Sequence, residues 1–209
     1  VERMSLSIDH VTKRFGQFNA VSDLTIQVPK GEMFGMLGAN GAGKTTTFRM
    51  MLGLLEPSEG KITWDQKKID YSRTSIIGYL PEERGLYPKL TVKEQLLYLG
   101  RLKGMKKAEI ISSMKDWLEK FKVPEYETKK IEELSKGNQQ KIQFIAAVLH
   151  RPELIILDEP FSGLDPLNVD LLKKAVNDLK NEGATIVFSS HRMEHVEELC
   201  EHLCIMHKG

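Results

Sequence analysis

Cysteines and long apolar runs are the features that this sequence has least of. Only Cys200 and Cys204 occur among the 209 residues, and a pair four positions apart suits neither a disulfide framework nor a four-ligand zinc site. A reducing, intracellular setting is therefore expected. The apolar runs are short, such as residues 144–149, and none approaches the ~18 residues of a membrane-spanning helix. Residues 1–4 lack the apolar core of a signal peptide. Any role at a membrane is expected to depend on a partner chain.

An excess of charge of one sign is also absent. Thirty Lys and Arg residues against 29 Asp and Glu residues give a formal net charge of +1, so the overall charge favours neither nucleic acid nor an anionic lipid surface as a partner. Hydrophobic residues make up 41% and charged residues 28% of the chain, which is ordinary for a globular protein. The length is sufficient for one domain with a smaller lobe beside its core.

A glycine-rich loop lies between an apolar run at 33–37 and a helix-compatible stretch at 46–52. Its letters at 38–45 match the G-x-x-x-x-G-K-T spacing of a phosphate-binding loop. In such a loop backbone N–H groups turn towards the phosphates, Lys44 reaches the outer phosphates and the Thr45 hydroxyl binds Mg²⁺. The helix N-terminus adds its positive dipole end. The alternative is a turn that binds nothing. The predicted nucleotide-binding residues are Gly38, Ala39, Asn40, Gly41, Ala42, Gly43, Lys44, Thr45 and Thr46.

Polar residues follow two further apolar runs. Asp158 and Glu159 come directly after residues 154–157, as expected for a buried parallel strand whose carboxyl end opens on a ligand site. Asp158 suits the organisation of Mg²⁺, and Glu159 suits the activation of a water that attacks a phosphate. The alternative is that both carboxylates are solvated. His191 ends the strand-like run 184–190, where a structural and a catalytic role are both open.

The hydrophobic periodicity predicts an α/β fold with an inserted helical lobe. Helical spacing covers residues 92–121 with a break at Gly104, and further helices are expected after Ser135 and over 167–181. The first two strands form an antiparallel β-portion before the glycine loop. Apolar residues of the lobe region, such as Leu86, Tyr87 and Leu90, are candidates for contact with a partner. Strands are expected over residues 6–15, 19–28, 33–37, 61–64, 75–80, 154–157, 184–190 and 203–206.

Three positions have two interpretations each. Phe15, at a strand end, is placed either to stack on a nucleobase or to pack in the core. Ser135 opens a helix, so it is either an N-cap or part of a second anion site. His191 and His195 fit the H-x-x-E-H pattern of some zinc peptidases. That pair straddles a strand-to-helix junction and has no assigned third ligand, so a phosphate site is favoured over zinc.

Taken together, the motifs resemble a known family. The segments 38–45, 134–141, 155–159 and 162–166, followed by His191, occur in the order found in the ATP-binding cassette of ABC transporters. The resemblance covers nearly the whole chain. The sequences of residues 78–87 and 134–141 are similar to those of the branch that serves sodium-export and drug- or antibiotic-export systems in bacteria and archaea.

The resemblance implies a fold and an activity. The fold is a P-loop NTPase core with a mainly parallel sheet, an N-terminal antiparallel β-portion and an inserted helical subdomain. The core is expected at 1–83 and 135–209, and the helical subdomain at 84–134. The activity is hydrolysis of ATP with Mg²⁺ by two cassettes, identical or paralogous, that close head to tail around two ATP molecules. They would drive a separate transmembrane permease, for export, from the cytoplasmic face of the cell membrane. No nucleic-acid partner is expected.

The resemblance also implies roles for single residues. Phe15 takes the place of the adenine-stacking aromatic, Thr45 and Asp158 organise Mg²⁺, Glu159 activates water and His191 contacts the γ-phosphate. The residues that act on the dimer partner form a separate group: Ser135, Gly137 and Asn138 face the partner's ATP, and Asp165 communicates across the dimer.

Two positions depart from the family pattern. Lys136-Gly137-Asn138 stands where Gly-Gly-Gln is usual, and the Ser and second Gly are kept. Glu82 stands where a Gln is usual; a carboxylate there can bind Mg²⁺ but adds negative charge beside the phosphates.

Two other function classes fit less well. A cassette that acts on nucleic acid or ribosomes usually has a twin on the same chain or a long coiled-coil insertion, and this chain has neither. A GTPase of the kind that reads guanine through an Asn/Thr-Lys-x-Asp run is disfavoured because that run is absent.

Overall fold

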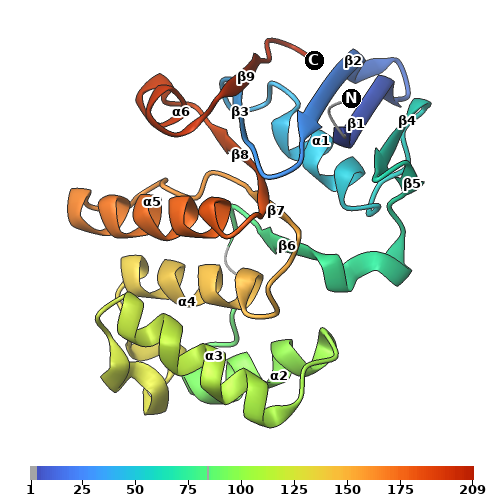
Figure 1. Cartoon of the computed structure of the whole chain (residues 1–209). Helices are drawn as coiled ribbons and strands as arrows, with labels where there is room; N and C mark the ends of the chain where they lie inside the picture. The colour runs from blue at the N-terminus through green and yellow to red at the C-terminus, as the bar shows by residue number, and fades with distance from the viewer. Residues whose placement is uncertain (1–3, 84) are drawn as a thin grey trace.

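In residues 4–83 and 85–209, which the computed structural model describes, a five-stranded parallel sheet forms the centre of the fold (Figure 1). Every residue of β7 (Leu154–Leu157) and β8 (Thr185–Ser190), two of its three inner strands, is buried, as expected for parallel strands covered on both faces. The carboxyl ends of the strands meet at one edge, where ligands of such sheets bind. The strand order is β6 (Ile77–Leu80), β7 (Leu154–Leu157), β8 (Thr185–Ser190), β3 (Met33–Leu37) and β9 (His202–Ile205).

A second sheet is antiparallel, as the sequence predicts. Its strand order is β2 (Phe18–Pro29), β1 (Met4–Phe15), β4 (Glu59–Trp64) and β5 (Lys67–Lys68). β1 and β2 form a hairpin whose last pair is Phe15 with Phe18. Gly16 in the turn has a φ of 59°, which glycine adopts without strain. Because directly paired residues share a face of a sheet, the hairpin brings both phenyl rings to the same side of its closed end.

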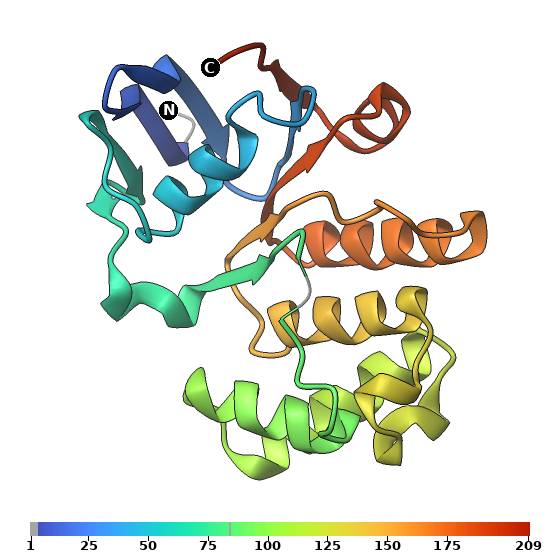
Figure 2. The same cartoon turned by 180° about the vertical axis from the view of Figure 1, so that it is seen from behind.

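Helix α1 (Lys44–Met51) packs between the two sheets. Phe48 and Met51 are fully buried in a core cluster that also contains Trp64 of β4 and Met36 of β3. The reverse view shows α1 against the antiparallel sheet (Figure 2). This packing holds the start of α1 beside the end of β3, so the glycine loop between them is fixed at both ends.

The helical lobe contains α2 (Val92–Leu102), α3 (Lys107–Lys120) and the short 3₁₀ helices η2 (Pro124–Thr128) and η3 (Ile131–Glu133). Helix α4 (Lys136–Val148) lies between this lobe and α5 (Pro166–Asn181) (Figure 1). The rings of Trp117 and Phe144 lie 5.6 Å apart, and the same core cluster continues to Ile155 of β7. Because packing is continuous across α4, the division into 1–83 with 135–209 and 84–134 stays a prediction.

Some element ends differ from the sequence prediction. Residues 75–80 were expected to form a strand, but the strand begins at Ile77, because η1 (Tyr71–Ile76) is a 3₁₀ helix. Its N-cap, Asp70, accepts a hydrogen bond of 2.9 Å from the Ser72 backbone, an arrangement that favours a turn over a strand. Helix α6 (Met193–Leu199) follows β8, and β9 begins at His202. Across the described ranges, no helix combines the length and the apolar character needed to cross a lipid bilayer.

Candidate nucleotide site

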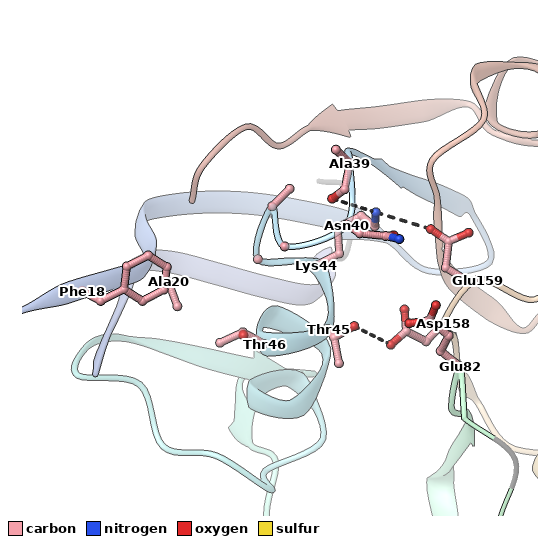
Figure 3. A pocket seen from close by; sticks show the side chains of 13 residues that line it. Phe18, Ala20, Ala39, Asn40, Lys44, Thr45, Thr46, Glu82, Asp158 and Glu159 are labelled. Atoms are coloured by element: carbon pink, nitrogen blue, oxygen red, sulfur yellow. Dashed lines mark hydrogen bonds and ion pairs between the residues drawn. The ribbon is translucent and has the colours of Figure 1, made fainter. Parts of the chain in front are cut away.

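A cavity of about 490 Å³ opens beside the glycine loop and the end of β7. Eight of the nine predicted loop residues, Ala39 to Thr46, line it, and Gly38 is the exception. Figure 3 shows Phe18 at one end of the cavity and the carboxylates of Glu82, Asp158 and Glu159 at the other. An aromatic end and a polar end, joined by backbone N–H groups, suit a nucleotide whose base and phosphates lie apart.

Two glycines of the loop are required by the way it packs. Gly43, the N-cap of α1, has a φ of 105°, and a Cβ built on it would lie 2.5 Å from the Ala20 carbonyl oxygen. A Cβ on Gly38 would lie 2.7 Å from the Met206 carbonyl oxygen. Real Cβ atoms do not approach backbone this closely, so neither position accepts a side chain. The glycines therefore shape the loop before any ligand binds.

The Lys44 ammonium lies inside this loop. The side chain is buried, and its Nζ donates hydrogen bonds to the carbonyl oxygens of Gly38 and, at 3.4 Å, Ala39. It also lies 3.3 Å from Glu159 Oε1, an ion pair in which both side chains are almost fully buried. A buried cation enclosed by backbone oxygens is positioned to bind an anionic oxygen at the mouth of the loop.

Asp158 is held by hydroxyl groups on both of its carboxylate oxygens. Thr45 Oγ1 donates to Oδ2 at 2.8 Å, and Ser189 Oγ donates to Oδ1 at 2.6 Å. Ser189 Oγ also accepts from the Glu159 backbone N–H at 2.8 Å. A fixed carboxylate beside a threonine hydroxyl is a hard oxygen donor set of the kind that Mg²⁺ prefers, so the residues present fit that ion.

Glu159 has a strained backbone and a carboxylate that is paired through both of its oxygens. Its φ of 49° is unusual for a residue with a side chain, and such conformations cost about 1–3 kcal/mol and gather at functional sites. The carboxylate is buried; Oε2 pairs with His191 Nδ1 at 2.9 Å, and Oε1 pairs with the Lys44 ammonium at 3.3 Å. Glu159 lines the cavity, so an anionic ligand that draws the lysine towards itself would free Oε1 to accept a hydrogen bond from water.

The two histidines of the H-x-x-E-H pattern have different surroundings. His191 is half exposed and contacts Glu159, but it is not among the residues that line the cavity. His195 is buried, its ring lies 4.9 Å from that of Phe161, and neither of its nitrogens has a hydrogen-bond partner in the described part of the chain. Burial lowers the pKa of His195. Of the two histidines, His191 is thus the one in contact with a residue that lines the cavity.

The residues expected to act on a partner lie outside this cavity. Ser135 is the N-cap of α4 and accepts a hydrogen bond from the Asn138 backbone at 3.3 Å; a residue that caps a helix can also face an anion, so its role at the partner's ATP stays a prediction. Asn138 Nδ2 donates to the Tyr126 hydroxyl at 3.0 Å. Asp165 caps α5, and hydrogen bonds from the backbone and side chain of Asn168 lower the pKa of Asp165. None of the four predicted residues, Ser135, Gly137, Asn138 and Asp165, lines the cavity of its own chain.

The two aromatic residues of the hairpin differ in their placement. Phe15 is half exposed, with the Lys13 ammonium 5.2 Å from its ring centre, and it is not among the residues that line the cavity. Phe18, its cross-strand partner, lines the cavity. Sequence reasoning missed Phe18, although the strand pairing that brings it there follows from a tight turn at Gly16.

Glu82 lies at the polar end of the cavity, and Ser189 supports that end without lining it. Glu82 lines it, opposite Thr45. Burial, and then the negative charges of Asp158 and Glu82, raise the pKa of the neighbouring Tyr79 hydroxyl to about 12. Sequence reasoning also missed Ser189, whose signal is a hydroxyl residue at the end of an otherwise apolar strand.

Comparisons with known proteins agree with this geometry. Residues 21–162 match the family model described as ABC transporter. Over 204 residues, 98% of this chain and 68% of the relative, the sequence is 66% identical to the uncharacterized ABC transporter ATP-binding protein YhaQ of Bacillus subtilis (strain 168). Over 174 residues it is 78% identical to an uncharacterized ABC transporter ATP-binding protein of Alkalihalophilus pseudofirmus, covering 83% of this chain and 65% of the relative. The chain thus spans about two thirds of the length of these relatives.

A solved structure has the same fold. The structure described as the ATP-binding subunit of an ABC transporter superposes with a TM-score of 0.90 at 34% identity, over 98% of this chain and 87% of that one.

Proposed function

The chain belongs to the ABC transporter family as an ATP-binding subunit, and we propose that two cassettes of this kind close head to tail around two Mg-ATP molecules and drive a separate transmembrane permease. The observation that carries the proposal is the polar end of the cavity, where the Lys44 ammonium and the fixed Asp158 carboxylate face the same space as Glu159. One site thus contains the Lys44 cation for the phosphates, the Asp158 carboxylate for the metal ion and the Glu159 carboxylate for the attacking water.

The phosphates and the metal ion have separate binding groups. The backbone N–H groups of the loop and the Lys44 ammonium would bind the phosphate oxygens, and Thr45 with Asp158 would hold Mg²⁺. The ion, when bound, would neutralise charge on the outer phosphates. Ser189 keeps the Asp158 carboxylate in one orientation, so the metal-binding oxygen is positioned in advance.

Glu159 would orient and deprotonate the attacking water. Its Oε2 is engaged by His191, and its Oε1 would be released for the water when a phosphate takes over the Lys44 ammonium. His191 holds the carboxylate, and the resemblance implies that it would also contact the γ-phosphate. The expected activity is Mg-dependent hydrolysis of ATP. A purified sample that shows no magnesium-dependent ATPase activity, alone or with its permease, would overturn the proposed function.

The adenine ring is expected to stack at the closed end of the hairpin. Because the resemblance gives the stacking role to Phe15, we expect Phe15→Ala to raise the Kd for ATP by about tenfold, since one base–aromatic stack contributes ~1–3 kcal/mol, and Phe18→Ala, which removes the ring that lines the cavity, to raise it less. Titration of each variant with a fluorescent ATP analogue measures both values. The opposite ranking would assign the base to Phe18, the ring that lines the cavity.

A second cassette is needed because Ser135 and Gly137 lie outside the cavity of their own chain. The first turn of α4 offers backbone N–H groups and a positive dipole end, which suit the γ-phosphate of a nucleotide held by the partner. Head-to-tail closure would complete each site with α4 of the other copy. The Asp165 cap adjoins this turn, since a Cβ on Gly137 would lie 3.0 Å from Asn168 Nδ2.

Gly137→Ala tests the dimeric site. Within one chain the added methyl group meets a side-chain amide at 3.0 Å and no backbone atom closer than that, so the fold should tolerate it. We expect ATPase activity to fall by about 100-fold, because a displacement of ~1 Å at a reacting phosphate has an effect of this size. The Kd for ADP should stay within about twofold. An active Gly137→Ala variant would show that this turn does not approach a nucleotide.

The permease is expected to dock on the helical lobe. A groove of about 220 Å³ lies between the loop after β6 and helices α2 and α4, lined by Leu86, Leu99 and Leu102 among others. The exposed rings of Tyr87 and Tyr98 lie beside it, 6.1 Å apart. An apolar groove with an aromatic rim suits a short helix of a membrane partner. The cassette would then lie at the cytoplasmic face of the membrane. The similarity of residues 78–87 to the export branch favours export.

A further inference from the structure

Helix α4 carries two buried glutamines on one face. Gln140 is 6% exposed and Gln143 is 4% exposed, although the helix around them is apolar and includes Ile142 and Phe144. Residues three apart on a helix lie on the same side of it. A buried side-chain amide is costly unless it is hydrogen-bonded, so the partners of these two amides are informative.

Both amides donate to backbone next to a carboxylate of the site. Gln143 Nε2 donates to the Glu83 carbonyl oxygen at 3.1 Å and to that of Pro81 at 3.4 Å. These two residues flank Glu82, which lines the cavity. Gln140 Nε2 donates to the Pro160 carbonyl oxygen at 3.1 Å, directly after Glu159. The two amides thus hold the two loops that carry Glu82 and Glu159.

The loop around Glu82 has few other attachments. Among the described residues, no side chain other than Gln143 hydrogen-bonds residues 81–83, and Pro81 has no N–H to donate. The far end of the loop is held separately, because Gln95 Oε1 accepts a hydrogen bond of 2.7 Å from the Tyr87 backbone. Gln143 is therefore the contact that fixes the backbone on both sides of Glu82.

We propose that Gln143 is a positioning residue of the nucleotide site, which holds the Glu82 carboxylate at the cation end of the cavity. The proposal rests on the proposed function, because Glu82 acts there on the metal–nucleotide complex. Helix α4 would then have two roles. Its first turn would face the partner's nucleotide, and Gln140 and Gln143 would position the carboxylates of the site in its own chain.

The test measures the metal ion directly. Mn²⁺ serves as the probe, and its binding to the ATP complex is followed by electron paramagnetic resonance in the Glu159→Gln background, where ATP is not consumed. We expect Gln143→Leu, which keeps the volume and removes the donor, to raise the Kd for Mn²⁺ by about tenfold, as lost support of a metal-binding group commonly does. Gln143→Met should do the same if Gln143→Leu folds poorly.

A double-mutant cycle separates positioning from general loosening of the lobe. If Gln143 acts through Glu82, Gln143→Leu should cause no further loss in a Glu82→Ala background. Gln95→Leu is the matched control, since it removes a buried glutamine of α2 that holds the far end of the same loop, and it should leave the Kd for Mn²⁺ within about twofold. An unchanged Kd in folded Gln143→Leu, or an equal loss in the Glu82→Ala background, would overturn the inference alone. If the Glu159→Gln protein with Gln143 unchanged does not bind Mn²⁺-ATP, both this inference and the proposed function are overturned.

Discussion

Glu159→Gln is expected to lower ATP hydrolysis by about 100-fold or more while ATP binding is kept. The amide keeps the size of the side chain but loses the basic oxygen that would take a proton from water, and a positioned general base contributes ~10²–10⁴-fold. Because hydrolysis would no longer reopen the ATP-bound dimer, the variant should accumulate as a dimer in the presence of ATP. Phosphate release measures the rate, and size-exclusion chromatography with light scattering in ATP and Mg²⁺ measures the mass.

Glu153→Gln is the matched control for this substitution. Glu153 stands directly before β7 and Glu159 is the second residue after it; the Glu153 side chain is about half exposed and lies 4.0 Å from Lys30, at the opposite end of the strand. The ATPase activity of the Glu153→Gln protein should equal that of the unmodified chain. A Glu159→Gln protein that hydrolyses ATP at the full rate would remove Glu159 from the mechanism.

Lys44→Ala is expected to raise the Kd for ATP by at least about tenfold. A charge-assisted hydrogen bond contributes ~1.5–3 kcal/mol, which corresponds to roughly 10-fold to 150-fold in affinity. The substitution also removes the cation that pairs with buried Glu159 at 3.3 Å, so a lower midpoint of thermal unfolding should accompany the loss of binding. Isothermal titration with ATP and differential scanning calorimetry measure the two effects.

The control for Lys44→Ala is Lys61→Ala. The Lys61 side chain is 72% exposed and lies 3.6 Å from Asp9 on the antiparallel sheet, and surface pairs of this kind contribute little. Both the Kd for ATP and the unfolding midpoint should be unchanged. If Lys44→Ala binds ATP as tightly as Lys61→Ala does, the loop does not use its lysine for phosphate.

The parts of the site that sequence predicts best are those that lie on a continuous stretch of chain. The loop from Gly38 to Thr45 needs only the strand before it and the helix after it, and the cavity lining contains all of this loop except Gly38. Asp158 and Glu159 were found in the same way, because an apolar run of four residues that ends in two acids implies a buried strand end.

The contacts that cross the chain could not be predicted in this way. Ser189 reaches Asp158 across 31 positions, and Gln143 reaches Glu83 across 60 positions, so neither partner can be found without knowing which strands and helices are neighbours. Phe18 was missed because a hairpin places two aromatics on one face and only tertiary packing decides which lines the cavity. The roles of Phe15, Ser135, Gly137, Asn138 and Asp165 stay predictions.

The most direct test of the account is a structure of Glu159→Gln with ATP and Mg²⁺. The account predicts a head-to-tail dimer in which the Ser135 hydroxyl and the backbone of the following turn lie within hydrogen-bonding distance of the γ-phosphate bound by the partner's glycine loop. A structure in which Ser135 faces bulk water in every assembly would contradict it.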